Sequence, residues 1–292
     1  MNGFAVINKG LGISSSDVVI KCRNALSRAI NEKTKCGHMG TLDPMAEGVL
    51  IIAFGNATRL FDYLLSKEKS YEATFTFGEA RDTVDRAGKV IATSDLPQYQ
   101  RVLDVLPNFI GEISQVPPKY SAVNVNGQRA YDMARAGKDF QLDAKKVTVK
   151  DITVLDKTLI GDFCKDLKVS ITCGSGTYIR SLCSDIAKEA GVCGYMSKLT
   201  RVACGGYTLQ DSVELNEFIK NPYENVRNVK GLLQQVMPVI QLDEKSYIKL
   251  RNGRCIDSDL QEGTYGVEYN SNVCFIISVK RNKAKSVCYL QD

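Results

Sequence analysis

The chain has 292 residues, of which 44% are hydrophobic, and it carries a formal net charge of +5 at pH 7. This length and composition are typical of a globular protein with one large domain and a smaller appendage, and they argue against a disordered chain. No stretch approaches about 18 uninterrupted apolar residues, and the N-terminal sequence lacks the basic start and apolar run of a signal peptide. We therefore expect a cytoplasmic protein that has no membrane partner.

The cysteine and histidine content bears on metal binding. The ten cysteines are spread along the chain, mostly in apolar contexts, and no two are spaced as C-x-x-C. His38 is the only histidine, whereas structural zinc sites combine cysteine and histidine ligands at short spacings. We therefore expect reduced cysteines in the core and no metal site.

Basic residues concentrate in four segments of the chain. Such clusters would suit a surface that follows the phosphates of a nucleic acid. Because the net charge is mild, they are equally compatible with the solvated faces of an ordinary enzyme. The segments are residues 67–69, 129–138, 145–150 and 280–285.

Hydrophobic periodicity predicts the secondary structure in chain order. A short strand at residues 3–8 precedes a glycine-bearing turn, and a helix then runs to about residue 30, with Ser15 or Ser16 and Asp17 at its capped start. The elements that follow are a strand at 48–54, a helix at 57–65, a strand at 70–77, a helix at 96–107, a short helix at 129–137, strands at 147–155 and 167–173, and a helix at 177–190. Strands and helices alternate irregularly, so we expect an α+β fold with a large mixed or antiparallel sheet.

The pattern changes in the last quarter of the chain. Residues 221–237 read as mainly helical, and Pro238 precedes short strand signals separated by glycine-bearing turns. We expect one domain over residues 1–230 and a small β-rich domain over residues 238–292. About 55 residues are too few to bury a large core alone, so this second domain should lean on the first.

The densest group of unusual residues is the segment GHMGTLDP at residues 37–44. Its glycines and its proline fix a non-repetitive backbone, and they present His38 and Asp43 from a rigid loop just before a buried strand. Taken alone, such a turn is usually structural, with Asp43 as a cap and His38 packed in the loop.

This segment resembles the GHxGTLDPxAxGVL signature of the TruB family of pseudouridine synthases, and further matches follow in the family's order over roughly residues 3–210. They are KEKSY at residues 67–71, a GxxTDTxD-like stretch at 78–85, PPKYSA at 117–122, GTYIRSL at 176–182 and the LxR segment at 199–201. Two departures stand out. The family's KPxG reads KGLG at residues 9–12, which loses the fixed φ of a proline, and Arg81 replaces a threonine.

The resemblance implies a pseudouridine synthase fold, with a large mixed, mainly antiparallel sheet flanked by helices and a small C-terminal module similar to the RNA-binding PUA domain. It also implies the reaction, the isomerisation of uridine 55 in the T-loop of tRNA to pseudouridine on a flipped-out base. The implied partner is the T-arm stem-loop of tRNA. No cofactor is expected, because an isomerisation needs no redox partner. No obligate protein partner is expected either.

The resemblance assigns Asp43 as the nucleophile, and a carboxylate can attack either C6 of uracil or the anomeric carbon of the ribose. A dry pocket would raise the pKa of the Asp43 carboxyl and so disfavour the ionised form that the reaction needs. Arg180 is expected to offset this effect, because a guanidinium stays charged and can hold a carboxylate in two-pronged geometry. Tyr71 is expected to stack on the uracil, with its hydroxyl near C5, where a proton must leave.

The remaining assignments concern binding. Tyr178 is expected to position the base or the ribose, and Leu199 to line the pocket. His38 is expected to contact the RNA and to fill the gap that the flipped base leaves in the stack. Outside the family's motifs, each of these residues would be interpreted as an ordinary packed side chain.

Two alternatives remain. One is a guide-RNA-dependent pseudouridine synthase, which shares the GHxGTLDP segment but usually has a longer chain with a fuller PUA module. The other is a non-catalytic chaperone that folds tRNA by binding alone. Asp43, Arg180 and Tyr71 together favour an enzyme, because binding alone would not need all three.

Overall fold

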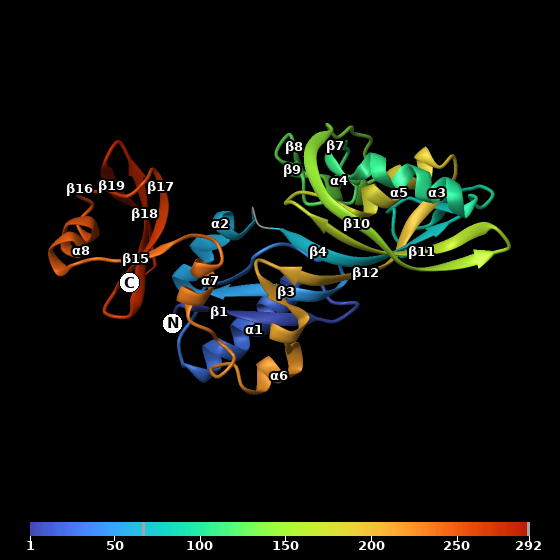
Figure 1. Cartoon of the computed structure of the whole chain (residues 1–292). Helices are drawn as coiled ribbons and strands as arrows, with labels where there is room; N and C mark the ends of the chain where they lie inside the picture. The colour runs from blue at the N-terminus through green and yellow to red at the C-terminus, as the bar shows by residue number, and fades with distance from the viewer. Residues whose placement is uncertain (66–67, 291–292) are drawn as a thin grey trace. The chain divides into compact units, whose positions relative to one another are not determined.

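The computed structural model describes residues 1–65 and 68–290, and the chain divides into two compact units. The first unit comprises Met1–Pro44, Gly48–Lys67 and Ala203–Asp292, and the second comprises Met45–Glu47 and Glu68–Val202. The first and last segments of the chain, blue and red in Figure 1, therefore belong to the same unit. Lys67, from one of the predicted basic segments, lies outside the described residues.

Three neighbouring strands build the main sheet of the first unit: β14 (Val213–Glu214), β1 (Gly3–Lys9) and β3 (Glu47–Phe54). Strand β1 is antiparallel to β3 and parallel to β14, and β2 (Cys36–His38) pairs antiparallel with β3. Both β1 and β3 are buried along nearly their whole length. Their continuous apolar runs are typical of strands that are covered on both faces.

Helix α1 (Ser15–Ala29) confirms the predicted helix, but its cap differs from the prediction. Ser14, and not Ser15 or Ser16, is the N-cap residue, and it forms a capping box with Asp17. Buried Val18 and Leu26 lie on one face of α1, and α6 (Leu215–Lys220) also contacts this helix. The other helical segments near the sheet are η1 (Gly55–Leu60), α2 (Phe61–Leu65) and η3 (Leu209–Asp211).

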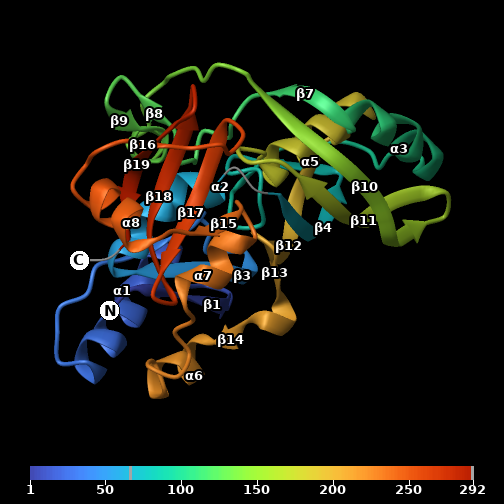
Figure 2. The same cartoon turned by 60° about the vertical axis from the view of Figure 1, so that its left-hand side comes forward.

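The C-terminal segment forms a five-stranded sheet in the first unit, in the order β15-β17-β18-β19-β16. Its elements are β15 (Val239–Gln241), α8 (Glu244–Arg251), β16 (Ile256–Asp257), β17 (Gly263–Tyr269), β18 (Asn272–Lys280) and β19 (Lys283–Tyr289) (Figure 2). One cluster of its apolar side chains includes Leu250 and Phe275, whereas Ile276 belongs to a cluster shared with Phe4 and with Leu232 of α7 (Val229–Gln234). The prediction that this region leans on the N-terminal part is therefore confirmed.

The second unit has a mainly antiparallel sheet in the order β12-β4-β11-β10-β7. These strands are β4 (Lys69–Phe77), β7 (Gly111–Gln115), β10 (Lys145–Ile160), β11 (Phe163–Cys173) and β12 (Gly194–Cys204), the last of which continues into the first unit and pairs there with β13 (Tyr207–Thr208). Helix α5 (Ile179–Glu189) contacts β4 and α3 (Tyr99–Val105), and η2 (Leu106–Phe109) follows α3. Two small hairpins complete the unit, β5 (Glu79–Arg81) with β6 (Val90–Thr93), and β8 (Asn124–Val125) with β9 (Gln128–Arg129), which leads into α4 (Ala130–Arg135).

The α+β class with a large mixed, mainly antiparallel sheet and a β-rich C-terminal region is confirmed. The predicted helix at residues 221–237 is wrong in its first half, because only Val229–Gln234 is helical. Within the described residues, no helix is both long enough and apolar enough to cross a membrane.

Candidate active site

The loop that carries Asp43 is fixed on both sides by backbone contacts. The Ser15 hydroxyl at the start of α1 donates to the carbonyl of Leu42 and accepts from its N–H, both at 2.8 Å, and the Gly12 N–H donates to the carbonyl of Pro44 at 2.7 Å. Asp43 lies between these anchors and is half-buried. The backbone that carries the Asp43 side chain is therefore held in place although it belongs to no helix or strand.

Two glycines allow this loop to form. Gly40 has φ +124° and Gly48 has φ +107°, conformations that a residue with a Cβ rarely adopts. His38 is the last residue of β2, opposite Ile52 of β3, and it is half-buried. The sequence predicted one loop for both residues, whereas the structure places His38 at the end of β2 and only Asp43 in the loop that follows.

A buried lysine supports the turn in front of α1. Lys9 is completely buried, and its Nζ donates to the carbonyls of Gly10 and Ile13, both at 2.9 Å. These bonds close the turn at the place where the family's proline is missing. No role was predicted for Lys9, although a lysine at the end of an apolar strand was a signal for one.

In the second unit, Arg180 is the point at which three sequence motifs meet. Its guanidinium donates to the carbonyls of Thr83 at 3.1 Å and Tyr120 at 2.8 Å, and it lies 3.5 Å from a carboxylate oxygen of Asp85. Both charged side chains are 6% exposed. Arg180 and Asp85 therefore form a buried ion pair.

Asp85 is a site residue that the sequence analysis missed. One oxygen of its carboxylate accepts from the Thr83 hydroxyl at 2.7 Å and from the Ala87 N–H at 2.9 Å, while the other faces Arg180. These contacts satisfy a buried charge, which would otherwise be costly. The signal was present in the sequence, because Asp85 is the second aspartate of the TDTxD-like stretch.

The backbone beside Asp85 is strained. Val84 has φ +61°, a conformation that is unfavourable for a β-branched residue and costs on the order of 1–3 kcal/mol. Strand β12 holds Val84 in place, because the Met196 N–H donates to its carbonyl at 3.1 Å and the Met196 carbonyl accepts from Arg86 at 3.2 Å. Packing against β12 thus maintains the turn that presents Asp85 to Arg180.

A second anchor fixes the start of helix α5. The side-chain amide of Gln115, which is 1% exposed, accepts from the Tyr178 N–H at 2.8 Å and donates to the Tyr178 carbonyl at 3.1 Å. The Ser181 hydroxyl donates to the carbonyl of Val116 at 2.7 Å. Because Tyr178 is the N-cap residue of α5 and has no side-chain cap of its own, the end of β7 supplies the contacts that position Tyr178 and Arg180.

Tyr71 and Leu199 lie on the neighbouring strands β4 and β12. Tyr71 is opposite Ile171 of β11 and is 7% exposed, and Leu199 is 8% exposed. Tyr71, Tyr178, Arg180 and Leu199 therefore belong to the second unit, and His38 and Asp43 belong to the first.

The thiol nearest to the Asp43 segment in sequence is not suited to nucleophilic chemistry. Burial raises the pKa of Cys36 to about 12, although Arg23 opposes the shift. A thiol with this pKa is protonated at neutral pH and is a poor nucleophile. Among the described residues, no group of three or more His, Cys, Asp or Glu side chains could hold a metal ion.

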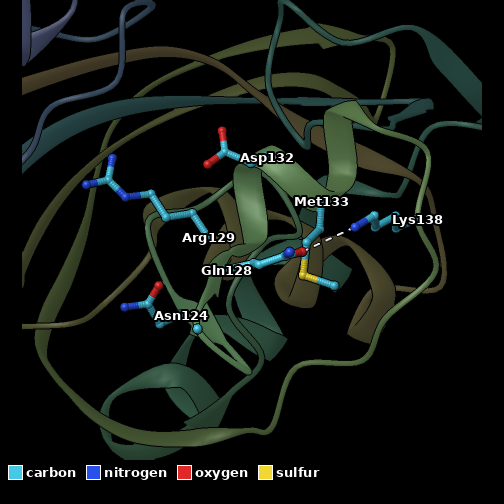
Figure 3. A pocket seen from close by; sticks show the side chains of 7 residues that line it. Asn124, Gln128, Arg129, Asp132, Met133 and Lys138 are labelled. Atoms are coloured by element: carbon cyan, nitrogen blue, oxygen red, sulfur yellow. Dashed lines mark hydrogen bonds between the residues drawn. The ribbon is translucent and has the colours of Figure 1, made fainter.

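The predicted basic segment at residues 129–138 forms one wall of an open polar groove of about 540 Å³ in the second unit (Figure 3). Arg129, Asp132 and Met133 line it together with Lys138, whose Nζ donates to Gln128 at 3.2 Å. Its lining thus mixes a carboxylate, amides and cations, and this segment does not form a purely positive surface.

Comparison with known families places the chain among RNA-modifying enzymes. Residues 28–179 match the N-terminal domain of the TruB family of pseudouridylate synthases, and residues 180–242 match the C-terminal domain of tRNA pseudouridylate synthase B. A protein named tRNA pseudouridine synthase B from Rhodospirillum rubrum is 45% identical over 217 residues, which cover 74% of this chain and 68% of the relative. The protein of the same name from Corynebacterium glutamicum is 33% identical over 290 residues, which cover 99% of this chain and 95% of the relative.

Solved structures show the same fold at lower identity. A chain from a Cbf5-Nop10-Gar1 complex aligns with a TM-score of 0.73 and 20% identity, over 99% of this chain and 85% of that chain. A chain from an H/ACA RNP bound to a substrate RNA containing 2'-deoxyuridine aligns with a TM-score of 0.72 and 19% identity. At these identities the likeness concerns the fold alone.

Proposed function

Because the chain belongs to the TruB family of pseudouridine synthases, we propose that it isomerises uridine 55 in the T-loop of tRNA to pseudouridine. The observation that carries this proposal is the 33% identity to a tRNA pseudouridine synthase B over 99% of the chain. The relatives matched by sequence bear this name, which favours a stand-alone tRNA enzyme over a guide-RNA-dependent one. The T-arm stem-loop is the proposed partner, with no obligate protein partner, and the cytoplasm is the proposed location.

In the proposed reaction Asp43 is the nucleophile. It attacks either C6 of the uracil or the anomeric carbon of the ribose, the N1 glycosidic bond breaks, and the freed uracil rotates and rejoins the ribose through C5. The bond between Asp43 and the attacked carbon breaks, which frees the carboxylate, and N1 takes up a proton. The proton on C5 then leaves, and Tyr71 stands near that carbon. The anchoring of Leu42 and Pro44 supports this role for Asp43, because a nucleophile needs a fixed approach to the bond that it attacks.

Arg180 is proposed to keep Asp43 ionised, with Asp85 as the group that orients the guanidinium. The burial of the Arg180 and Asp85 pair supports this arrangement, because a buried guanidinium with fixed partners is preorganised for a further carboxylate. Tyr178 positions the base or ribose, Leu199 lines the pocket, and His38 fills the gap left in the RNA.

The remaining parts of the chain are proposed to bind RNA. Residues 1–230 form the catalytic domain, and residues 238–292 form a small PUA-like domain that contacts the RNA. Flipping the uridine costs a few kcal/mol, which contacts to phosphates and bases must offset. No cofactor is proposed, so activity should survive dialysis against a chelator.

The test is product formation on a tRNA transcript with no other RNA or protein present. We expect wild-type protein to convert uridine 55, and Asp43→Asn to form no product while its affinity for tRNA stays within a few-fold. Asp139→Asn, which removes an exposed carboxylate, is the matched control and should remain active. Turnover by Asp43→Asn would refute the mechanism, and tRNA binding without product by wild-type protein would support the chaperone alternative.

A further inference from the structure

A positively charged groove lies between α1 and α6 in the first unit. Its volume is about 550 Å³, and Lys21, Arg28 and Lys220 line it together with Asn24, Ile219 and Pro222. This α1–α6 groove is separate from the segments that the sequence analysis selected as basic. Its residues belong to no motif of the family.

The geometry of α1 collects the charges on one side. Lys21, Asn24 and Arg28 are spaced by three and four residues, so they lie on the same face of the helix. All three are exposed, whereas Val18 and Leu26 are buried. Lys220 is the last residue of α6, and α6 contacts α1.

The charge of this groove is not neutralised by its own lining, which contains three cations and no carboxylate. In the described part of the chain, none of the three forms an ion pair within 4 Å. The nearest acidic residue in the helix, Asp17, is hydrogen-bonded to Ser14. Lys21 lies four residues further along α1, and its charge helps to lower the pKa of Asp17 without forming an ion pair. Several lysines elsewhere do have carboxylate partners, and these are Lys119, Lys146, Lys150, Lys168, Lys230 and Lys283.

Because many other lysines are paired with carboxylates, the predicted basic segments are less suited to bind RNA phosphates than their sequence indicates. The predicted basic segments at 145–150 and 280–285 contain lysines that are paired with acids, namely Lys146, Lys150 and Lys283. Cations at the end of a helix do interact with its dipole, but that effect is worth only about 0.3–1 kcal/mol and leaves the charge exposed. Lys21, in the middle of α1, does not take part in it.

We propose that the α1–α6 groove binds the phosphodiester backbone of the RNA substrate, as a contact separate from the one that holds the reacting uridine. A guanidinium can take a phosphate in two-pronged geometry, and ammonium groups add point charges beside it. The inference rests on the proposed function, because it takes the RNA substrate as the polyanion.

The groove is distant from the reacting residue along α1. Ser15 contacts Leu42, the neighbour of Asp43, and the rise of a helix puts Arg28 about 20 Å further along the axis. A phosphate in the groove would therefore belong to a nucleotide other than the one that reacts. Such a contact positions the RNA and carries no sequence information.

The test is the salt dependence of tRNA binding. We expect Lys21→Gln/Arg28→Gln to weaken binding and to reduce the slope of log affinity against log salt by about 1 to 2, because each lost phosphate contact removes roughly 0.7–0.9 from it. Glutamine keeps the helix propensity of both positions close to that of the native residues. Circular dichroism and thermal melting check that the variant is folded.

The matched control is Lys157→Gln/Lys168→Gln, which lowers the net charge equally but removes cations that face Tyr99 and Glu72. An unchanged slope in the groove variant, or an equal decrease in both variants, would overturn the inference. Product formation by wild-type protein in the same preparation separates the two proposals. If wild-type protein is active and the groove variant binds normally, only the groove is refuted; if wild-type protein is inactive, the proposed function fails.

The source of the phosphate can be located with two RNAs. A loss of affinity for both full-length tRNA and an isolated T-arm stem-loop would place the contact within the T-arm. A loss confined to full-length tRNA would place it in another arm. Either result supports the groove, whereas no loss with either RNA contradicts it.

Discussion

Arg180 shows how one side chain can join segments that are far apart in the chain. Its ion-pair partner Asp85 is 95 residues away, and the carbonyl of Tyr120 is 60 residues away. Because both charges are buried, removing one leaves the other without compensation, at a cost of about 3–5 kcal/mol. A substitution of Arg180 should therefore change both the stability of the fold and the rate of the proposed reaction. The two effects must be measured separately.

We expect Arg180→Met to lower both stability and the single-turnover rate. Asp85→Asn in the same chain removes the uncompensated charge, so the double variant should regain much of the stability but none of the activity. Urea unfolding and single-turnover kinetics on tRNA measure the two effects. Arg101→Met, at an exposed arginine that donates to the Glu189 carbonyl, is the control. If the double variant regained activity, Arg180 would be structural only.

Side-chain contacts from the sheet of the second unit hold the start of helix α5 in position. Gln115 ends β7, and its amide pairs with both backbone groups of Tyr178 in the way that a neighbouring strand would. The start of helix α1 is likewise held by side-chain hydrogen bonds. Ser14 caps this helix, and the hydroxyl of Ser15 anchors the loop of Asp43.

Gln115→Leu should release the start of α5. It leaves the N–H and carbonyl of Tyr178 without this partner, at about 1–3 kcal/mol for each group that stays buried, and we expect a lower melting temperature and a lower catalytic rate. Gln115→Glu keeps an acceptor for the N–H, so its loss should be smaller. Equal losses in the two variants would show that the hydrogen bonds to Tyr178 are unimportant.

Ser14→Ala should destabilise the protein by about 1 kcal/mol near neutral pH, because the capping box is lost. Hydrogen bonds from Ser14 lower the pKa of Asp17 below the ordinary value of an aspartate. A lowered pKa in the folded state means that this contribution is present above about pH 4 and is lost as the pH falls further. The difference in unfolding free energy between wild type and variant should therefore shrink between pH 6 and pH 3. A constant difference would contradict this account.

For the whole molecule, the return of the C-terminal segment to the first unit couples the two ends of the sequence. Val273 and Ile276 of β18 share an apolar cluster with Phe4 and Val6 of β1. The Arg59 guanidinium and the Asn2 amide donate to backbone carbonyls near the C-terminus, at 2.7 Å and 2.8 Å. The small sheet is therefore part of the core that supports β1 and β3.

Ile276→Ala should weaken this shared core by about 2–5 kcal/mol, the usual cost of a cavity at a fully buried isoleucine. Hydrogen exchange of the β1 amides should become faster, although β1 and β18 are far apart in the sequence. Val287→Ala, at an exposed position of β19, is the control and should leave exchange in β1 unchanged. Unaltered exchange in the Ile276→Ala protein would mean that the C-terminal sheet is stabilised independently.

The sequence by itself determined the elements whose pattern is local, and the family. Apolar runs predicted β1 and β3, alternation predicted β4, and helical spacing predicted α1, because each pattern is fixed by the geometry of one segment. The motifs predicted His38 and Asp43 as neighbours in one loop, and in the structure His38 ends β2 while Asp43 lies in the loop that follows. The chemical roles of these residues remain predictions for the experiments above.

Only the tertiary structure decided how distant segments meet. Asp85 as the partner of Arg180, Gln115 as the support of Tyr178 and the core shared by β18 and β1 each depend on contacts between segments that are widely separated in sequence. No periodicity records such contacts, because burial and hydrogen bonding at these positions are set by strand order and by the packing of loops. The lining of the α1–α6 groove, three cations without a carboxylate, was likewise decided by the tertiary structure. A sequence shows where cations are, but it does not show which side chains line a groove with them.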